Sequence, residues 1–529
     1  MLAVLAFGGA FAITFTRESA SGHALLNTES FVALAFFLLV FLRSLPEEAG
    51  PRRRERNRYL AVAVMLCAIV LAAYWSILDA PFLYDDYTHI TDATNSTLRT
   101  VVSAFGPEKH KPGLAFRPFG FFIYWLNFLW AGAHPRNWHF SSMVLHAASC
   151  VLLFALCRKL RMTWTGSLSA ALLFALNASS AEAVSWIDAR FDPMTTSLVL
   201  GSLLCFCRFL ESGRRAWILS ALAIGTLAMF SKESAFCLPL LAACLWFFRP
   251  EFRPEFRSKD EEHDGPDQRD QLRRLWTGCA GFAGLAVALF AYRWWALGGI
   301  GGYRSSPGRT DISQFHPLHT LNALALRDWA ILFFPLNWSA APGLVLRIFL
   351  ISTPLVLAAC AWWGRIPKRV FLGSIALTLA AALPVQHLLL IDTDLSGSRL
   401  VYLLSVGWAI LWGNLFSAIP RAHWRVLAIA WMLALQALML RHNLAEWTTV
   451  PVEARNACAA FAQTVGSTQE PVVVSGLPNK KRGVVFLHGG FPECVQMNGG
   501  IPLGRIQVRD GPVANYFWND SSGRIEPVR

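Results

Sequence analysis

Charged residues are scarce in this chain of 529 residues: only 15% are Asp, Glu, Lys or Arg, whereas 54% are hydrophobic. A soluble protein of this size would still show long amphipathic stretches. Here the apolar runs are nearly unbroken and recur through most of the chain. They approach the length of about 20 residues that a helix needs to cross a bilayer, which excludes an ordinary soluble fold.

These runs also lack any alternation of apolar and polar residues. A membrane-spanning β-barrel needs alternating segments of about ten residues. In lipid, only helices and closed barrels satisfy every backbone polar group internally, so helices remain. The sequence therefore predicts an all-α polytopic membrane bundle with about 11–13 transmembrane helices, followed by a small extramembrane α+β domain.

The eleven cysteines show no zinc-type spacing with histidine. Nine of them lie in apolar runs, where we interpret them as small buried hydrophobic residues. Only Cys458 and Cys494 lie in the polar C-terminal part, and they could form a disulfide that spacing alone does not establish. Met1–Thr16 lacks the basic region and cleavage site of a signal peptide, so we interpret it as a helix.

The net charge of +13 comes from basic residues in short loops between apolar runs. The excess of Lys and Arg in cytoplasmic loops explains this pattern, so no nucleic-acid partner is expected. The strongest basic cluster, Pro51–Arg58, is placed in the cytoplasm. The helix Leu60–Leu78 then runs outward, and Asp85 and Asp86 emerge on the far side.

Three parts are predicted from this topology. Residues 1–58 form an N-terminal hydrophobic hairpin and basic loop, residues 59–441 a membrane domain, and residues 442–529 an external α+β domain, which begins where the apolar pattern ends. Leu321–Phe334 is interpreted as interfacial or re-entrant. The later spans are predicted near Trp138–Leu156, Thr165–Leu176, Pro193–Phe209, Ala216–Phe230, Ala235–Phe248, Trp276–Leu297, Leu344–Trp363, Val370–Val385, Leu400–Phe416 and Val426–Leu440.

The C-terminal part contains three short β-type runs bounded by glycine and proline: "PVVVSGLP", "GVVFLHGG" and "GRIQVRD". The segment His488–Gly490 superficially resembles an oxyanion-hole loop. No G-x-S-x-G motif accompanies it, so a plain turn is the better interpretation.

Unusual polar residues gather on the external side of this topology. Ionisable residues at membrane depth are candidates for function. Carboxylates alone would indicate cation binding, but arginine beside carboxylates favours an anionic, phosphate-bearing substrate. A carboxylate with a raised pKa can also take a proton from a hydroxyl nucleophile. The residues are Asp85, Asp86, His89, His110, Arg117, Glu182, Asp188, Arg190, Asp192, Lys232, Glu233, Asp392, Asp394 and Arg399.

Each of these residues also has a plain structural interpretation. Asp85 and Asp86 could cap a helix in a solvated loop, and Arg117 could mark a helix that starts at Pro118. Arg399 could reach toward lipid headgroups. Glu182, Asp188 and Arg190 could be mutual ion pairs, which we prefer for Asp188, and Lys232 with Glu233 could be a turn pair.

Several motifs follow one another in order along the chain, and the first is "FLYDDYTHI", directly after an apolar helix. This motif resembles the first external loop of the GT-C glycosyltransferases, which use polyprenyl- or dolichyl-phosphate sugars. The closer resemblance, over about residues 60–420, is to bacterial relatives of the transmembrane-and-tetratricopeptide-repeat O-mannosyltransferases. It rests on "FRPFGFFIYWLNF", "HPRNWHFSSMVLHAASCVLLF", "SSAEAVSWIDARFDPMTT", "LAMFSKESAFCLPLL", "WAILFFPLNWSA" and "SGSRLVYLLSVGWAIL".

The chain departs from this family in several places. No tetratricopeptide repeats follow the membrane part, and the N-terminal hairpin is extra. Ser141, Ser180 and Ser398 stand where the family often has other residues. The lack of repeats and the short loops favour a bacterial inner membrane, with the site and the C-terminal domain on the periplasmic side.

The resemblance implies an inverting transfer of a sugar, such as mannose, from a polyprenyl-phosphate donor to a hydroxyl of a protein, lipid or glycan. It makes Asp85 the candidate base, with Asp86 orienting it or contacting the acceptor or a metal. Whether Mg²⁺ or Mn²⁺ takes part stays open. Arg399, Lys232 and Arg117 are the expected donor-phosphate ligands. The expected sugar or acceptor pocket comprises Glu182, Arg190, Asp192, Glu233, His89, His146 and Tyr402.

Two other functions also fit a polytopic membrane protein. A transporter or flippase for a polyprenyl-linked sugar would place polar residues at the midplane, often in two repeated halves, and neither is evident. A structural assembly subunit would leave the charge clusters incidental.

Overall fold

The computed structural model describes residues 52–107, 115–249, 268–299, 328–363, 366–385, 393–466, 471–509 and 514–528, with Leu318, Leu321 and Ile391. The predicted N-terminal hairpin, Leu2–Phe15 with Phe31–Leu45, lies outside these residues. Residues 322–327 of the predicted interfacial segment also lie outside them, and its described C-terminal end contains the short helix α15 (Asp328–Phe333).

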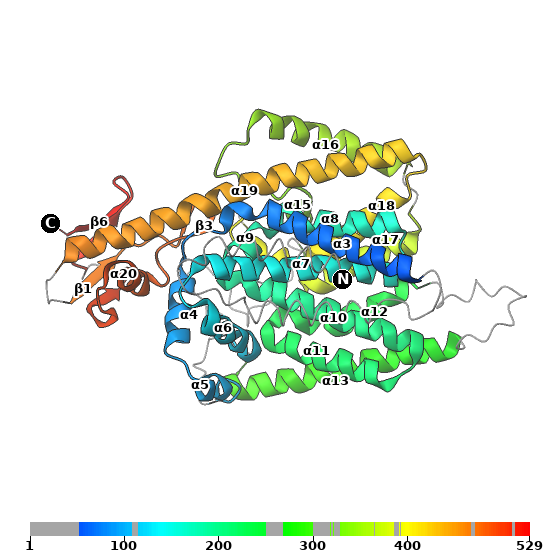
Figure 1. Ribbon diagram of the computed structural model, residues 1–529, viewed down its shortest axis with the longest axis horizontal. Coiled ribbons are helices and arrows are strands. Elements are labelled where there is room, and N and C mark those ends of the chain that lie inside the picture. Colours follow the sequence, from blue (N-terminus) through cyan, green and yellow to red (C-terminus); the bar gives the residue numbers. More distant parts are fainter. Residues whose placement is uncertain are drawn as a thin grey trace, which may run out of the picture.

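The membrane part is a bundle of roughly parallel and antiparallel helices (Figure 1). Within the described ranges, six stretches are long and apolar enough to cross a membrane, which confirms a multi-span helical protein: Glu55–Ala73, Pro135–Lys159, Trp164–Ser185, Asp188–Ser212, Arg269–Leu297 and Ala422–Val465. Four shorter apolar stretches accompany them: Arg215–Ser231, Glu233–Phe247, Leu344–Cys360 and Leu404–Ser417.

Most helix bounds agree with the predicted spans. The bundle helices are α3 (Arg52–Ala73), α7 (Pro135–Lys159), α8 (Trp164–Ala175), α10 (Phe191–Ser212), α11 (Arg215–Ser231), α12 (Leu238–Cys244), α13 (Gln268–Leu297), α16 (Leu344–Trp363), α17 (Lys368–Ala382), α18 (Leu404–Ser417) and α19 (Ala422–Val465).

Three short helices, α4 (Asp85–Thr94), α5 (Leu98–Ser103) and α6 (Pro118–Ala131), lie at one end of the bundle. Figure 1 shows the C-terminal strands and α20 (Phe491–Gly499) at this same end, whereas α3 begins at the opposite end. The basic cluster at the start of α3 and the aspartate pair at the start of α4 are therefore separated by the length of the bundle. Helix α6 begins at Pro118, as its sequence predicts.

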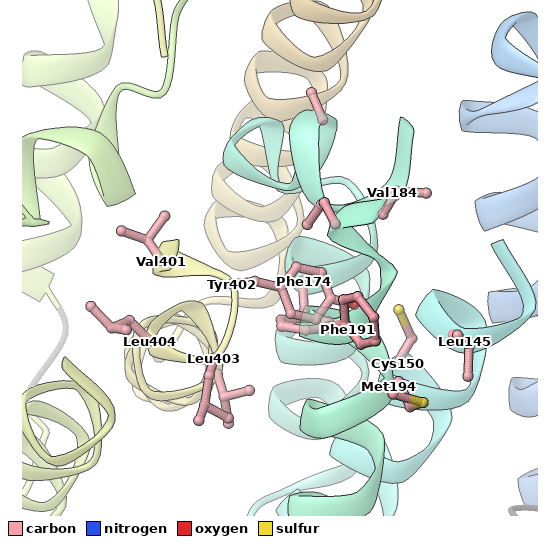
Figure 2. Close-up of a cluster of buried hydrophobic side chains, with 14 of the residues drawn as sticks. Leu145, Cys150, Phe174, Val184, Phe191, Met194, Val401, Tyr402, Leu403 and Leu404 are labelled. Carbon is pink, nitrogen blue, oxygen red and sulfur yellow. The ribbon is translucent and has the colours of Figure 1, made fainter. Parts of the chain in front are cut away.

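The interior of the bundle is apolar and closely packed. Figure 2 shows Tyr402, Phe174 and Phe191 within it, and the rings of Phe174 and Tyr402 lie 5.2 Å apart. A buried hydrogen bond of 2.5 Å joins the Tyr402 hydroxyl to His146 Nδ1, and His146 Nε2 lies 3.1 Å from the Ala175 carbonyl oxygen. These bonds satisfy the two polar side chains inside an apolar core.

The C-terminal part combines helix and sheet. Its main sheet has the strand order β4-β1-β5-β6, formed by β1 (Val472–Ser475), β4 (Ile506–Val508), β5 (Tyr516–Asn519) and β6 (Arg524–Pro527). Strand β1 is parallel to β4 and β5, and β5 is antiparallel to β6. A separate hairpin pairs β2 (Lys480–Lys481) with β3 (Val484–Val485).

A disulfide joins Cys458 in α19 to Cys494 in α20. The other nine cysteines are buried, as predicted. Helix α19 runs through the predicted boundary at residues 441 and 442 without a break, so one helix connects the membrane part to the C-terminal part.

Two glycines allow α8 and α18 to approach closely. A Cβ added to Gly413 would lie 2.9 Å from the Cβ of Ala170 and would overlap the carbonyl oxygen of Gly166. We expect the G413A variant to melt at a lower temperature, because overpacking a core costs about 1–3 kcal/mol.

The control is G284A in α13, where an added Cβ meets no atom within 4 Å. This variant should be neutral or gain about 0.5–1 kcal/mol, since alanine suits a helix interior better than glycine. Thermal unfolding of both variants in detergent micelles tests this, and equal melting temperatures would contradict the close-approach argument.

Candidate active site

The aspartate pair opens α4, directly after a residue with unusual backbone geometry. Tyr84 has φ 54° and ψ −123°, a region that residues with a side chain rarely adopt. This conformation turns the chain sharply out of the preceding loop and into α4. The two aspartates that follow then point in different directions and have different surroundings.

Asp86 is held entirely by backbone. Its Oδ2 accepts a hydrogen bond of 3.0 Å from the Leu83 amide, and its Oδ1 accepts one of 2.9 Å from the Asp188 amide. Burial raises the pKa of Asp86 well above its usual range, and the two amide donors oppose that rise in pKa. Asp86 therefore ties the start of α4 to the segment around Asp188, and both of its oxygens are occupied.

Asp85 is half-buried and stands apart. Among the residues that the structure describes, its carboxylate forms no hydrogen bond or ion pair. Burial raises the pKa of Asp85 to about 6, and the negative charge of Asp188 acts in the same direction. The positive charges of His89 and Arg399 oppose this rise in pKa, so both cations lie within electrostatic range of Asp85. A carboxyl group in this state can exchange a proton near neutral pH.

His89 lies one helical turn after Asp85 and contacts Asp188, with 2.6 Å between His89 Nδ1 and Asp188 Oδ1. Burial alone would lower the pKa of His89, but the Asp188 carboxylate raises that pKa to about 9. His89 is therefore charged at neutral pH. The sequence favours an ion pair of Asp188 within its own loop, with Glu182 and Arg190 as the other members, whereas the structure pairs Asp188 with His89 of α4.

The three cations predicted to bind phosphate each contact a carboxylate predicted for the pocket. Two of the three pairs link segments more than a hundred residues apart in the sequence. Glu182 and Asp192 are buried carboxylates that gain a compensating charge in this way, whereas Glu233 is partly exposed. The pairs are Arg399 with Glu182, Lys232 with Asp192 at 2.5 Å, and Arg117 with Glu233 at 2.9 Å.

Glu182 forms hydrogen bonds in addition to its ion pair with Arg399. Its carboxylate accepts hydrogen bonds from the Ser398 hydroxyl at 3.3 Å and from the Arg399 amide at 3.1 Å. The Arg399 guanidinium lies 4.8 Å from the centre of the Trp186 ring. The Tyr84 and Trp186 ring centres are 6.1 Å apart, so Trp186 lies between the residue preceding Asp85 and Arg399.

Three residues predicted for the pocket lie in packed surroundings instead. His146 and Tyr402 bond to each other in the bundle core, fully buried. Arg190 is also buried, donating to the Ser141 hydroxyl at 2.6 Å and lying 5.2 Å from the Trp138 ring centre. These contacts join different parts of the bundle, so we interpret the three residues as stabilising it.

The described side chains do not fit a metal site at the aspartate pair. Both oxygens of Asp86 already accept backbone hydrogen bonds, and Asp188 contacts His89. Within the described ranges, no three His, Cys, Asp or Glu side chains come together in a way that could hold a metal ion.

Two further features of the site are not evident from the sequence patterns. Arg293, in the apolar helix α13, contacts Glu233 at 2.9 Å as a second cation. The sequence feature that could have identified Arg293 is its position as a lone arginine among aromatic residues near the end of an apolar helix. Gly489, from the C-terminal part, lies against Asp85, and no local pattern indicates that contact.

These observations define a multi-span helical membrane protein with ionisable side chains gathered at one end of its bundle. Residues 110–259 match the family model of the dolichyl-phosphate-mannose-protein mannosyltransferases. This match confirms, over that segment, the resemblance predicted from the motifs.

Curated relatives carry the same family resemblance. Protein O-mannosyl-transferase tmtc2 of Xenopus laevis is 31% identical over 186 residues, covering 31% of this chain and 21% of the relative. Protein O-mannosyl-transferase TMTC3 of Homo sapiens is 26% identical over 160 residues, covering 29% of this chain and 17% of the relative. The match thus spans about a fifth of the length of these relatives.

Two solved structures align with much of this chain. An oligosaccharyltransferase of Archaeoglobus fulgidus aligns with 86% of this chain and 62% of its own, at 12% identity and a TM-score of 0.44. ArnT of Cupriavidus metallidurans aligns with 88% of this chain and 87% of its own, at 13% identity and a TM-score of 0.41.

The buried pair of Glu182 and Arg399 should matter for stability. We expect E182Q to lower the melting temperature strongly, because removing one partner of a buried pair costs about 3–5 kcal/mol. Because the Arg399 side chain is 23% accessible, the loss of folding free energy should lie toward the lower end of this range.

The matched control is D79N, which breaks the exposed pair of Asp79 and Arg136, with side chains 76% and 32% accessible. Exposed pairs contribute little, so D79N should melt like the wild type. Thermal unfolding in detergent compares the two variants, and an E182Q protein as stable as D79N would refute the structural role of the pair.

Proposed function

We propose that this chain is an integral-membrane inverting glycosyltransferase that moves a sugar from a polyprenyl-phosphate carrier to an acceptor hydroxyl. The observation that carries the proposal is Asp85, a half-buried carboxyl group with a pKa of about 6 and, among the described residues, no hydrogen bond or ion pair. The family match over residues 110–259 supports the donor class. The similarity to protein O-mannosyl-transferases favours mannose as the sugar and a protein as the acceptor.

In the proposed reaction, the acceptor oxygen attacks the anomeric carbon of the sugar while Asp85 takes the proton of the hydroxyl. The bond from that carbon to the phosphate oxygen breaks, and the polyprenyl phosphate leaves with the bonding electrons. Attack opposite the leaving phosphate inverts the anomeric configuration. No step requires a metal.

Arg399 is the proposed contact for the leaving phosphate. Its side chain is 23% accessible, compared with 13% for Arg117 and 7% for Lys232. Its pairing with Glu182 fixes the guanidinium, which suits paired hydrogen bonds to phosphate oxygens. Arg117 and Lys232 would add positive charge around the site from more buried positions.

The site is proposed to face the outside of a bacterial inner membrane. The basic cluster Pro51–Arg58 is expected in the cytoplasm, and helix α4, which begins at Asp85, lies at the other end of the bundle (Figure 1). Residues 59–441 would then form the catalytic membrane domain and residues 442–529 the external part. Membrane lipids, the lipid-linked donor and a protein, lipid or glycan acceptor are the proposed partners.

The D85N variant should lose sugar transfer, by at least about 100-fold, because an amide cannot take the proton. The control is D92N, an exposed aspartate of the same helix, which should keep wild-type transfer. Membranes from a strain lacking the protein and complemented with each variant are supplied with labelled polyprenyl-phosphate mannose. Covalent label in glycoproteins and glycolipids is then measured by mass spectrometry.

Full transfer by D85N would refute the assigned base. Movement of intact labelled donor across the membrane without a covalent product would instead identify a transporter. Equal loss in D85N and D92N would point to a folding defect of α4 rather than to chemistry.

Transfer should also depend on pH. The base must be ionised, so the rate should fall about tenfold per pH unit as the pH drops below the Asp85 pKa of about 6. The folded protein raises this pKa, so the acidic limb should lie well above the usual carboxyl range. A transfer rate that stays flat down to pH 5, in protein shown to remain folded there, would contradict the assignment.

A further inference from the structure

The C-terminal part touches the start of α4 through two consecutive glycines. A Cβ added to Gly489 would lie 2.6 Å from Tyr84 Cε1 and 2.8 Å from Asp85 Oδ1. Gly490 has φ 64°, and a Cβ there would overlap the Tyr84 carbonyl oxygen and lie 3.3 Å from the Thr88 hydroxyl. No larger residue fits either position without moving Tyr84 or Asp85.

Two more polar contacts connect the same elements. The Tyr84 hydroxyl donates to Asn479 Oδ1 at 3.3 Å, and Asn498 Nδ2 donates to the Tyr87 hydroxyl at 3.5 Å. Asn479 and Asn498 lie on either side of the glycine pair in the sequence. The C-terminal part thus holds α4 and the strained Tyr84 from several points.

Helix α20, which begins directly after Gly490, is fixed to α19. The disulfide between Cys458 and Cys494 joins the two helices covalently. Gly499 packs so closely on α19 that a Cβ there would overlap Ala462, and the rings of Phe461 and Phe491 lie 5.4 Å apart. Helix α20 is therefore fixed on α19, and the glycine pair that precedes α20 is held in place against α4.

The C-terminal part also contacts the segment that leads to Arg399. Lys480 Nζ lies 2.8 Å from Asp394 Oδ2. Gly483, at φ 82°, leaves no space for a Cβ beside the Asp394 carbonyl. Both segments that bear the proposed base and phosphate ligand are thus contacted by one external unit.

We propose that Gly489 and Gly490 are positioning residues for Asp85. Held by the Cys458–Cys494 disulfide, they stabilise the unusual positive-φ conformation of Tyr84 and so fix the direction in which the Asp85 carboxylate points. The assignment of a catalytic effect rests on the proposed function, but the positioning of α4 does not. The C-terminal part is, in this view, a component of the site.

The test compares G489A and G490A with two glycine variants of the same region. G504A matches G489A, since neither glycine has a positive φ and Gly504 meets no atom within 4 Å. G500A matches G490A, because Gly500 has φ 73° and also meets nothing within 4 Å. Each control reproduces the backbone change without the contact with Tyr84.

Two measurements are made on purified full-length protein in nanodiscs. Hydrogen exchange followed by mass spectrometry should show faster exchange across residues 84–94 in G489A and G490A, and wild-type exchange there in both controls. With polyprenyl-phosphate mannose as the donor, kcat should fall about 10- to 100-fold in G489A and G490A, while the donor KM stays within about twofold.

The double variant C458S/C494S provides a check that leaves the glycines unchanged. It should show the same faster exchange of residues 84–94 and the same selective loss of kcat. The proposal is overturned if residues 84–94 exchange alike in G489A, G490A and their controls, or if the glycine variants raise KM alone. If exchange changes as expected but D85N retains transfer, the positioning stands and the proposed function fails.

Discussion

The site depends on the rule that a charge removed from water needs a partner. An unpaired buried ion costs several kcal/mol, so a carboxylate at this end of the bundle must be paired, hydrogen-bonded or left partly exposed. The partner comes from a different element in each case, which ties the elements together. The pairs are Glu182 with Arg399, Asp192 with Lys232, Glu233 with Arg117 and Arg293, and Asp188 with His89.

The two neighbouring aspartates are stabilised in different ways. Asp86 satisfies the rule through two backbone amides and so becomes part of the scaffold. Asp85 satisfies it only by partial exposure and by a raised pKa, which leaves it chemically available. Burial and the negative charge of Asp188 are the main causes of the raised pKa of Asp85.

The sequence predicts those features that depend on local composition. Spans follow from apolar length, the start of α6 follows from Pro118, and the gathering of charges at one end follows from the distribution of basic loops. Pairings such as Glu182 with Arg399 join residues 217 apart, and only tertiary packing brings them together. Strands β5 and β6 lack a strong alternating pattern and are not predicted.

Motif position alone is also a poor guide to where a side chain points. His146 and Tyr402 belong to motifs of the family, yet they bond to each other inside the core. The segment His488–Gly490 lacks any catalytic motif, yet its glycines lie against Asp85. In both cases the deciding factor is which face of an element the packing buries, and a motif does not encode that.

Helix α19 has a mechanical consequence. Its 44 residues extend about 66 Å, roughly twice the thickness of a bilayer's hydrocarbon core. Part of the helix therefore extends beyond the thickness of a hydrocarbon core and holds the C-terminal part at a fixed distance from the bundle. A domain on a flexible linker could move to reach a partner, whereas a domain on one continuous helix cannot. In the proposed reaction, the acceptor would have to approach the site at that fixed distance from the lipid.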